Sequence, residues 1–158
     1  VINMRAQERA MARKQLDKRL NRLNNMDTLA RPPRGWIKAI REALGMTTAQ
    51  LAKRLGVSQP RVLGIEKAEV SGSIKLESLE RAARALDCRL VYALVPRKPL
   101  ESLVEERARN LAKKRLHATS HSMALEDQRV DQVDEQEHLE RLVQKLLDQP
   151  GSALWEDE

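Results

Sequence analysis

The chain has 158 residues and is 41% hydrophobic, but only 2% of its residues are aromatic and none is Phe. A core of Leu, Val, Ile and Ala is typical of helical proteins, and a chain of this length can bury one such core. The single cysteine, Cys88, excludes a disulfide within the chain. We find no signal peptide, lipidation motif or apolar run of about 18 residues, which predicts a cytoplasmic protein without a membrane partner.

Charge is divided unevenly along the chain. Residues 1–98 hold 21 Lys and Arg against 9 Asp and Glu, a net charge of +12, whereas residues 99–158 hold 8 against 14, a net charge of −6. A basic first part predicts a polyanionic partner, and an acidic second part predicts a different contact surface.

Residues 1–30 are expected to form an N-terminal helical arm. Apolar residues recur there at helical spacing among Arg and Lys, and the pattern ends near Asn24 and Asn25. A solvated, partly frayed helix fits the same pattern. The stiff basic connector RPPRG follows at residues 31–35.

Residues 31–98 are expected to form a bundle of four short helices that ends in a strand. The first helix is predicted over 36–44 and the last over 76–86, because apolar residues repeat there on one helical face. The inward-facing residues of these two helices are expected to be Trp36, Ile37, Ile40, Leu44, Leu76, Leu79, Ala83 and Leu86.

The two middle helices are predicted from the stretch TTAQLAKRLGVSQPRVLGIEK at residues 47–67. Thr47 and Gln50 have the spacing of a capping box, so a helix should begin at Thr48. Gly56 can adopt the positive φ that ends a helix. Ser58 is then expected to cap a second helix, with Val62 and Ile65 on its buried face.

Two short helices joined by a tight turn are typical of a helix-turn-helix, whose second helix lies in the major groove of DNA. An ordinary helical hairpin has the same pattern, and the basic charge favours DNA. Gln59 and Arg61 are the expected base readers, since Gln pairs with adenine and Arg with guanine. Pro60 is expected in the first turn of this second helix, where proline is well tolerated. The expected phosphate contacts are Thr48, Ser58 and Lys67, with Arg34, Lys53 and Arg54 on the surrounding basic surface.

Residues 89–95, RLVYALV, have the composition of a strand that Pro96 ends. No other strand is evident, so its cheapest partner is the same strand of a second copy, which predicts a homodimer through residues 89–95. A continued buried helix is the alternative.

Residues 99–149 are predicted to be a helical C-terminal region, because no Gly or Pro occurs between Pro99 and Pro150. A break is expected around residues 119–122, where short polar side chains interrupt the pattern. Residues 150–158 are expected to be a disordered tail. The fold class is therefore mainly α: a lambda-repressor-like helix-turn-helix bundle with one short strand and a helical extension.

We find no catalytic constellation, metal site or cofactor motif, and we predict that the protein is not an enzyme. His117 and His121 have the i, i+4 spacing of half a zinc site, but no further ligands accompany them. Solvated histidines are the preferred interpretation.

Residues 36–86 resemble the Cro-like and lambda-like repressors, also called the XRE type. The resemblance implies that Arg41 and Glu66 form a buried ion pair between the first and third helices. The strand predicted after the last of these helices, the fifth when the N-terminal arm is counted, resembles that of antitoxin repressors partnered with HipA kinases, which dimerise partly through such a strand.

The chain also resembles a narrower family, mobile mystery protein A. The matching segments are ARKQLDKRL, RPPRGWIKAIREALGMTTAQLAKRLGVSQPRV, LERAARALDCRLVYALVP and MALEDQ. Members are small helix-turn-helix proteins carried on bacterial mobile elements beside a Fic-domain protein, mobile mystery protein B. The resemblance implies a toxin–antitoxin pair.

Ser122 and Glu126 resemble a motif of Fic inhibitors, in which Ser or Thr is followed after three residues by Glu and then by Gly or Asn. Asp127 stands at the last position instead. The resemblance implies that Glu126 occupies the arginine that would grip the ATP γ-phosphate.

The sequence thus predicts a dimeric, nucleoid-associated repressor that is also the antitoxin of a Fic-type toxin. The alternative is a protein-interaction module that inhibits a Fic-domain partner without specific DNA readout. Gly64 favours that alternative, because it leaves no side chain at a position where a base reader is expected.

Overall fold

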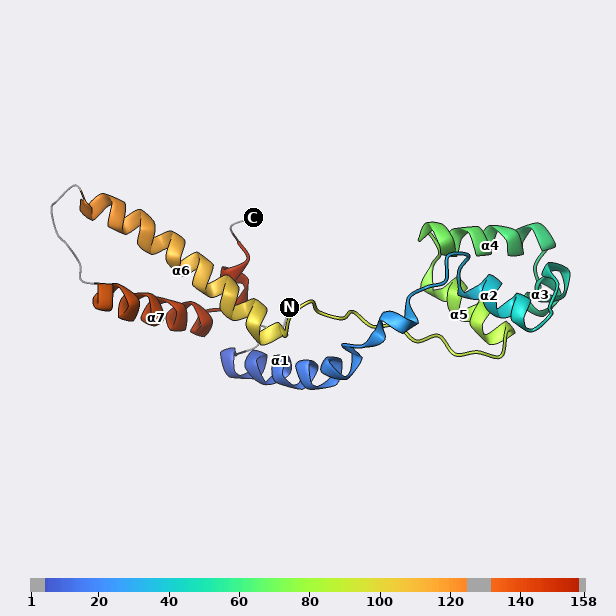
Figure 1. Cartoon of the computed structure of the whole chain (residues 1–158), viewed down its shortest axis with the longest axis horizontal. Helices are drawn as coiled ribbons and strands as arrows, with labels where there is room; N and C mark the ends of the chain where they lie inside the picture. Colours follow the sequence, from blue (N-terminus) through green and yellow to red (C-terminus); the bar gives the residue numbers. More distant parts are fainter. Residues whose placement is uncertain (1–4, 125–131, 157–158) are drawn as a thin grey trace. The chain divides into compact units, whose positions relative to one another are not determined.

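A computed structural model of the chain describes residues 5–124 and 132–156. The regular elements of these residues are all helices, which confirms the mainly helical prediction. The chain divides into two compact units, one made by residues 25–94 and the other by residues 1–24 together with 95–158. Figure 1 labels the helices of both units.

The unit of residues 25–94 is the predicted four-helix bundle. After a short 3-10 helix, η2 (Met26–Leu29), it contains α2 (Trp36–Ala43), α3 (Thr48–Leu55), α4 (Gln59–Ser71) and α5 (Leu76–Ala85). α2 and α3 both pack on α4, and α3 also packs on α5. The core consists of Ile37, Leu51, Ala52, Val62, Ala82 and Leu86.

Three residues predicted to face this core are exposed instead. Trp36 is 39% exposed, Leu44 58% and Leu76 52%. Trp36 and Leu76 are the first residues of their helices, and Leu44 follows the last residue of α2. A side chain at a helix end extends beyond the neighbouring helices, so its place in the apolar pattern does not ensure burial.

The strand predicted at residues 89–95 is wrong. No strand occurs among the described residues, and these seven have no regular structure. Val91, Tyr92 and Leu94 are between 68% and 81% exposed. A strand needs a partner for its backbone groups, and the described residues of one chain provide none.

The second unit contains α1 (Ala6–Leu20), the 3-10 helix η1 (Asn21–Leu23), α6 (Leu100–Ala124), α7 (Gln132–Asp148) and the 3-10 helix η3 (Gly151–Leu154). α6 packs on α7, and α1 packs on α6 (Figure 1). The core is formed by Ala108, Leu111, Ala112, Leu139, Val143, Leu146 and Leu154.

The N-terminal segment is therefore not a free arm, as a separate region of residues 1–30 implied. Polar contacts hold α1 to the C-terminal helices. Arg13 Nε donates to Glu101 Oε2 over 2.7 Å. The Asp17 carboxylate accepts from Leu100 N at 2.7 Å and from Glu101 N at 3.2 Å, which caps the first turn of α6. Hydrophobic periodicity alone does not reveal a contact of this kind.

Two further expectations fail in this unit. The predicted break at residues 119–122 is absent, because α6 continues to Ala124. Thr119 Oγ1 donates to Arg115 O one turn back, at 3.0 Å, instead of capping a new helix. The tail is ordered over Gly151–Leu154, where Leu154 is only 4% exposed against α6 and α7. Burial of that side chain offsets the entropy of ordering the segment.

Candidate nucleic-acid interface

The helix-turn-helix begins at the predicted cap. Thr47 Oγ1 accepts from Gln50 N at 3.1 Å, and Thr47 N donates to Gln50 Oε1 at 2.9 Å. α3 starts at Thr48 and ends before Gly56, whose φ of 69° lies in the left-handed region. The capping box and the glycine together set the length of α3, as predicted.

The second helix of the motif is α4. Ser58 occupies its N-cap position, but its side chain makes no capping hydrogen bond, so the predicted cap is correct only in position. Pro60 lies in the first turn, where a missing N–H removes no helical hydrogen bond. Ser58 is an exposed residue.

A buried ion pair fixes α4 against α2. Arg41 Nε donates to Glu66 Oε1 at 2.6 Å, and Arg41 Nη1 donates to Met46 O at 3.0 Å. Arg41 is 7% exposed and Glu66 5%. The pair implied by the repressor resemblance is confirmed, and it holds the back of α4 while leaving the opposite face to solvent.

A second buried carboxylate, which the sequence analysis missed, caps α2. Glu69 is 3% exposed, and its two oxygens accept from Trp36 N at 2.8 Å and from Ile37 N at 2.9 Å. Arg31 donates to the backbone carbonyls of Glu69 and Val70 at the end of α4. The connector before α2 is thus tied to α4, on the side away from the exposed face.

The predicted base readers lie on the exposed part of α4. Gln59 and Arg61 are both exposed. Gln59 Nε2 donates to Thr48 Oγ1 at 2.8 Å, which joins the first residues of α4 and α3. The amide keeps one N–H and its carbonyl oxygen free of that bond, the two groups needed for a bidentate contact with adenine.

Gly64 leaves the middle of this exposed face of α4 without a side chain. A Cβ built on it would meet no atom within 4 Å, so packing within the chain does not require glycine there. Leu63 beside it is 46% exposed. Leu63 lies four residues after Gln59, which places both on one flank of α4. An exposed apolar side chain on a recognition helix can contact a thymine methyl group.

The predicted phosphate contacts are spread over several parts of the helix-turn-helix unit. Ser58 and Lys67 are exposed on or beside α4, Thr48 is half-buried and bonded to Gln59, and Arg34 is exposed before α2. Lys53 and Arg54 line a hollow of about 600 Å³ with Leu44, Gly45, Met46 and Gln50. Arg54 Nη1 also donates to Ala85 O at 3.0 Å, so part of its guanidinium caps α5. The structure does not gather all of these cations into one pocket.

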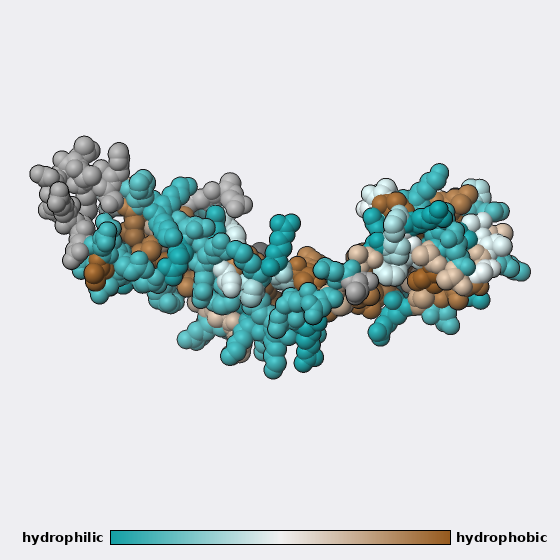
Figure 2. Space-filling model, viewed as in Figure 1, coloured by the Kyte–Doolittle hydropathy of each residue, from teal (hydrophilic) through white to brown (hydrophobic). Residues whose placement is uncertain are grey.

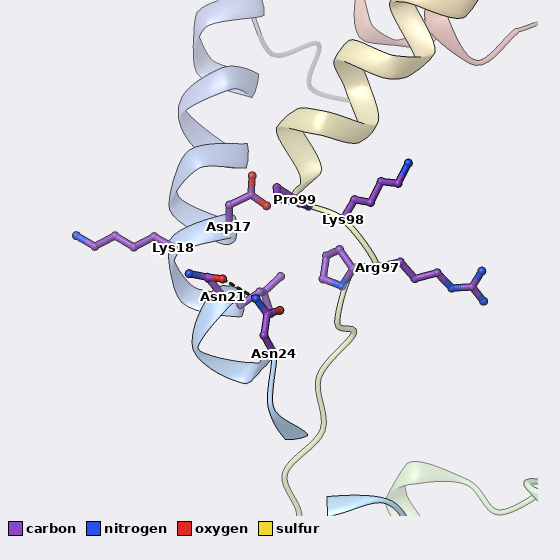
Figure 3. A pocket seen from close by; sticks show the side chains of 9 residues that line it. Asp17, Lys18, Asn21, Asn24, Arg97, Lys98 and Pro99 are labelled. Atoms are coloured by element: carbon purple, nitrogen blue, oxygen red, sulfur yellow. Dashed lines mark hydrogen bonds between the residues drawn. The ribbon is translucent and has the colours of Figure 1, made fainter. Parts of the chain in front are cut away.

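A hollow in the other unit does not present its cations to an anion. It has a volume of about 610 Å³ and lies between the end of α1 and residues 96–99. Figure 3 shows that Lys18 and Arg97 point away from it on opposite sides. The Asp17 oxygens already accept from the first turn of α6.

Two remaining expectations concern metals and the inhibitory motif. No cluster of potential metal ligands occurs among the described residues. Ser122 lies within α6, whereas Glu126 falls outside the described residues. Among the helices of residues 5–124 and 132–156, none combines the length and the apolarity that crossing a bilayer requires.

Comparison with known proteins agrees with this geometry. A family model described as helix-turn-helix matches residues 37–92, so the chain contains a helix-turn-helix domain. Over 56 residues the chain is 48% identical to the antitoxin HigA1 of Mycobacterium tuberculosis, in strains CDC 1551 / Oshkosh and ATCC 25618 / H37Rv. The match covers 35% of this chain and 36% of those relatives. No solved structure matches the chain.

Proposed function

We propose that the chain is a sequence-specific DNA-binding repressor that also serves as an antitoxin. The observation that carries the proposal is the exposed start of α4, where Thr48 holds Gln59 and Arg61 lies free of packing. In the major groove, each base pair presents a distinct pattern of hydrogen-bond donors and acceptors, which two such side chains can distinguish. The basic charge of residues 1–98 supplies attraction to phosphate.

A binding titration tests this proposal. Fluorescence anisotropy compares DNA from the chain's own promoter region with a scrambled duplex over a range of salt concentrations. We expect tighter binding to the promoter duplex, and affinity for both that falls steeply with salt because bound cations release counterions. Equal affinity for both duplexes would contradict sequence-specific repression.

The antitoxin role is supported by the helix-turn-helix match to HigA1, which is itself named an antitoxin. The acidic residues 99–158 offer a separate surface for a toxin, which we propose is a Fic-domain enzyme inhibited through Ser122 and Glu126. Co-expression of the adjacent gene product tests this. We expect the complex to survive Glu126→Gln while AMP transfer by the partner rises, and Glu135→Gln on α7 serves as the matched control.

We propose in addition that residues 89–95 mediate a homodimer. Val91 is 73% exposed, Tyr92 68% and Leu94 81%, an apolar set that burial against a second copy would remove from water. Sedimentation of Val91→Asp/Leu94→Asp should show a monomer. Val133→Asp, which alters a residue of α7 that is 65% exposed, should leave the dimer intact.

The open surface at Gly64 supports one other function, an interaction module without base readout. In that case Arg61→Ala would leave DNA discrimination unchanged, while partner binding through residues 99–158 would persist. The promoter titration therefore decides between the two functions.

A further inference from the structure

The outer side of α1 and of the 3-10 helix η1 that follows it carries a cluster of cations that the helix-turn-helix does not use. Lys14, Lys18, Arg19 and Arg22 are all exposed. Arg13 and Asp17, in contrast, contact the start of α6. Among the described residues, none of the four exposed cations forms an ion pair or a hydrogen bond through its side chain. We call these four residues the α1 cation cluster.

The cluster borders a hollow on the helix surface. That hollow has a volume of about 510 Å³ and is lined by Ala12, Gln15, Leu16, Lys18, Arg19 and Arg22. Lys14 and Lys18 are four residues apart in α1 and hence lie roughly 6 Å apart on one side of that helix. Arg22 follows four residues later, in η1. In Figure 2 the surface over α1 is mostly hydrophilic, with long side chains standing out from it.

Helix stability does not account for this arrangement. Like charges at i, i+4 destabilise an isolated helix. The one acidic residue between Arg9 and Met26 is Asp17, and its carboxylate is committed to the N–H groups of α6. The positive charge of the outer face is thus left uncompensated within this segment.

The surroundings of the cluster favour a nucleic acid over a membrane. The exposed apolar residues of α1 include Met11 and Leu16, five positions apart and hence on different sides of the helix. A membrane-surface helix needs one continuous apolar face, which this arrangement does not provide. Arg and Lys side chains with a neighbouring Gln amide are the groups that contact backbone phosphates.

We infer that the α1 cation cluster is a second DNA contact, which binds backbone phosphates without regard to sequence. The inference rests on the proposed function, since DNA held by residues 25–94 raises the phosphate concentration near the tethered α1. Its contribution is to affinity and to salt dependence, whereas base discrimination stays with α4.

Two matched triple variants test the inference in the full chain. The variant Lys18→Gln/Arg19→Gln/Arg22→Gln removes the cations of the hollow, and Lys113→Gln/Lys114→Gln/Arg115→Gln removes three exposed cations from α6. Affinity is measured against salt with the promoter duplex and with a mixed-sequence duplex of about 40 base pairs. In the first variant we expect the slope of log K against log salt to fall in magnitude by about 2 to 3, since each phosphate contact contributes about 0.9.

The promoter-to-mixed affinity ratio should stay unchanged in that variant, and the α6 control should keep the wild-type slope. An unchanged slope, an equal loss in the control, or a loss confined to the promoter duplex would each overturn the inference. Loss of binding to phosphatidylserine vesicles with DNA affinity retained would overturn it in favour of a membrane. Failure of the proposed function gives a different result. The wild-type chain would then bind the promoter and mixed-sequence duplexes with an affinity ratio near one, while the salt slopes of the α1 variant and the wild type would still differ.

Discussion

Gln59 Nε2 donates to Thr48 Oγ1 over 2.8 Å, so the first residue of α4 is bonded to the first residue of α3. The bond restricts a long side chain that would otherwise lose rotamer freedom on binding DNA. On the proposed function, in which Gln59 reads a base, the Thr48 hydroxyl orients its side chain before the duplex binds.

Thr48→Val should therefore weaken readout without altering the fold. Valine keeps the shape of threonine but cannot accept the Gln59 hydrogen bond, which is worth about 0.5 to 1.5 kcal/mol. We expect the preference for adenine at one position of each half-site to fall by that amount. Titration of duplexes that differ at single positions measures it, and Thr119→Val, which removes a hydroxyl from α6, should have no effect on DNA binding.

Substitutions of Arg61 and Lys53 should weaken DNA binding in different ways. Arg61→Ala is expected to remove about 1 to 3 kcal/mol of discrimination at one base pair per half-site. Lys53→Ala should weaken binding to every sequence about equally and reduce the salt slope by about one. Salt titrations with promoter and scrambled duplexes separate the two effects, and an equal loss of discrimination in both variants would contradict them.

Replacing only one partner of the buried Arg41–Glu66 pair should lower the stability of the fold strongly. Arg41→Met leaves the Glu66 carboxylate buried without its partner, and we expect the free energy of unfolding to fall by about 3 to 5 kcal/mol. The double variant Arg41→Met/Glu66→Leu should recover most of that loss, because no charge remains in the core. Urea unfolding measures both, and additive losses in the double variant would contradict the coupling.

Helix limits were predictable here because their chemistry is local. Thr47 and Gln50 are three residues apart, and their reciprocal hydrogen bonds need only one turn of helix. Gly56 ends α3 for an equally local reason. The Arg41–Glu66 pair was predictable only through the resemblance to repressors, since the two residues are 25 positions apart.

Other features depend on which distant segments the folded chain brings together. The Glu69 carboxylate caps α2 across 33 positions, and Asp17 caps α6 across more than 80. Neither carboxylate differs in local sequence from an ordinary solvated one. The wrong strand prediction at residues 89–95 also depends on distant segments. The composition of these residues suits a strand, but a strand forms only where another strand pairs with it.

Acid should weaken the link between α6 and α7. Arg109 Nη1 donates to Glu140 Oε1 at 2.6 Å, and this hydrogen bond lowers the pKa of the Glu140 carboxyl and raises the pKa of Arg109. A carboxyl whose pKa is lower in the folded chain stabilises it above the unfolded pKa, and this stabilisation is lost as pH falls through the folded pKa.

Glu140→Gln should therefore lower the Tm at neutral pH, and the difference from the wild type should vanish in acid below the usual Glu range. Because the side chains of Arg109 and Glu140 are 38% and 51% exposed, the difference should be small and should shrink in high salt. Thermal unfolding followed by circular dichroism over a pH series measures it, and a difference that persists in acid would contradict the assignment.

Gly35 and Gly64 should respond oppositely to alanine. Gly35 has a φ of 86°, and a Cβ there would lie 2.7 Å from Glu69 Oε1. Gly35→Ala should therefore destabilise the fold by about 1 to 3 kcal/mol and disturb the cap on α2. Gly64 lies within α4 with open space around it, so Gly64→Ala should stabilise the chain by about 0.5 to 1 kcal/mol. Urea unfolding of the two variants gives both values.

At Gly64, the same substitution should raise the stability of the fold and lower the affinity for DNA. If α4 lies in the major groove, its glycine lets the helix backbone approach the bases closely, and an added methyl group obstructs that approach. We expect Gly64→Ala to fold more stably yet to bind the promoter duplex less tightly, an outcome that no loss of structure can produce. Unchanged affinity in the stabilised variant would show that this face of α4 does not contact the duplex, and it would favour the interaction module over the repressor.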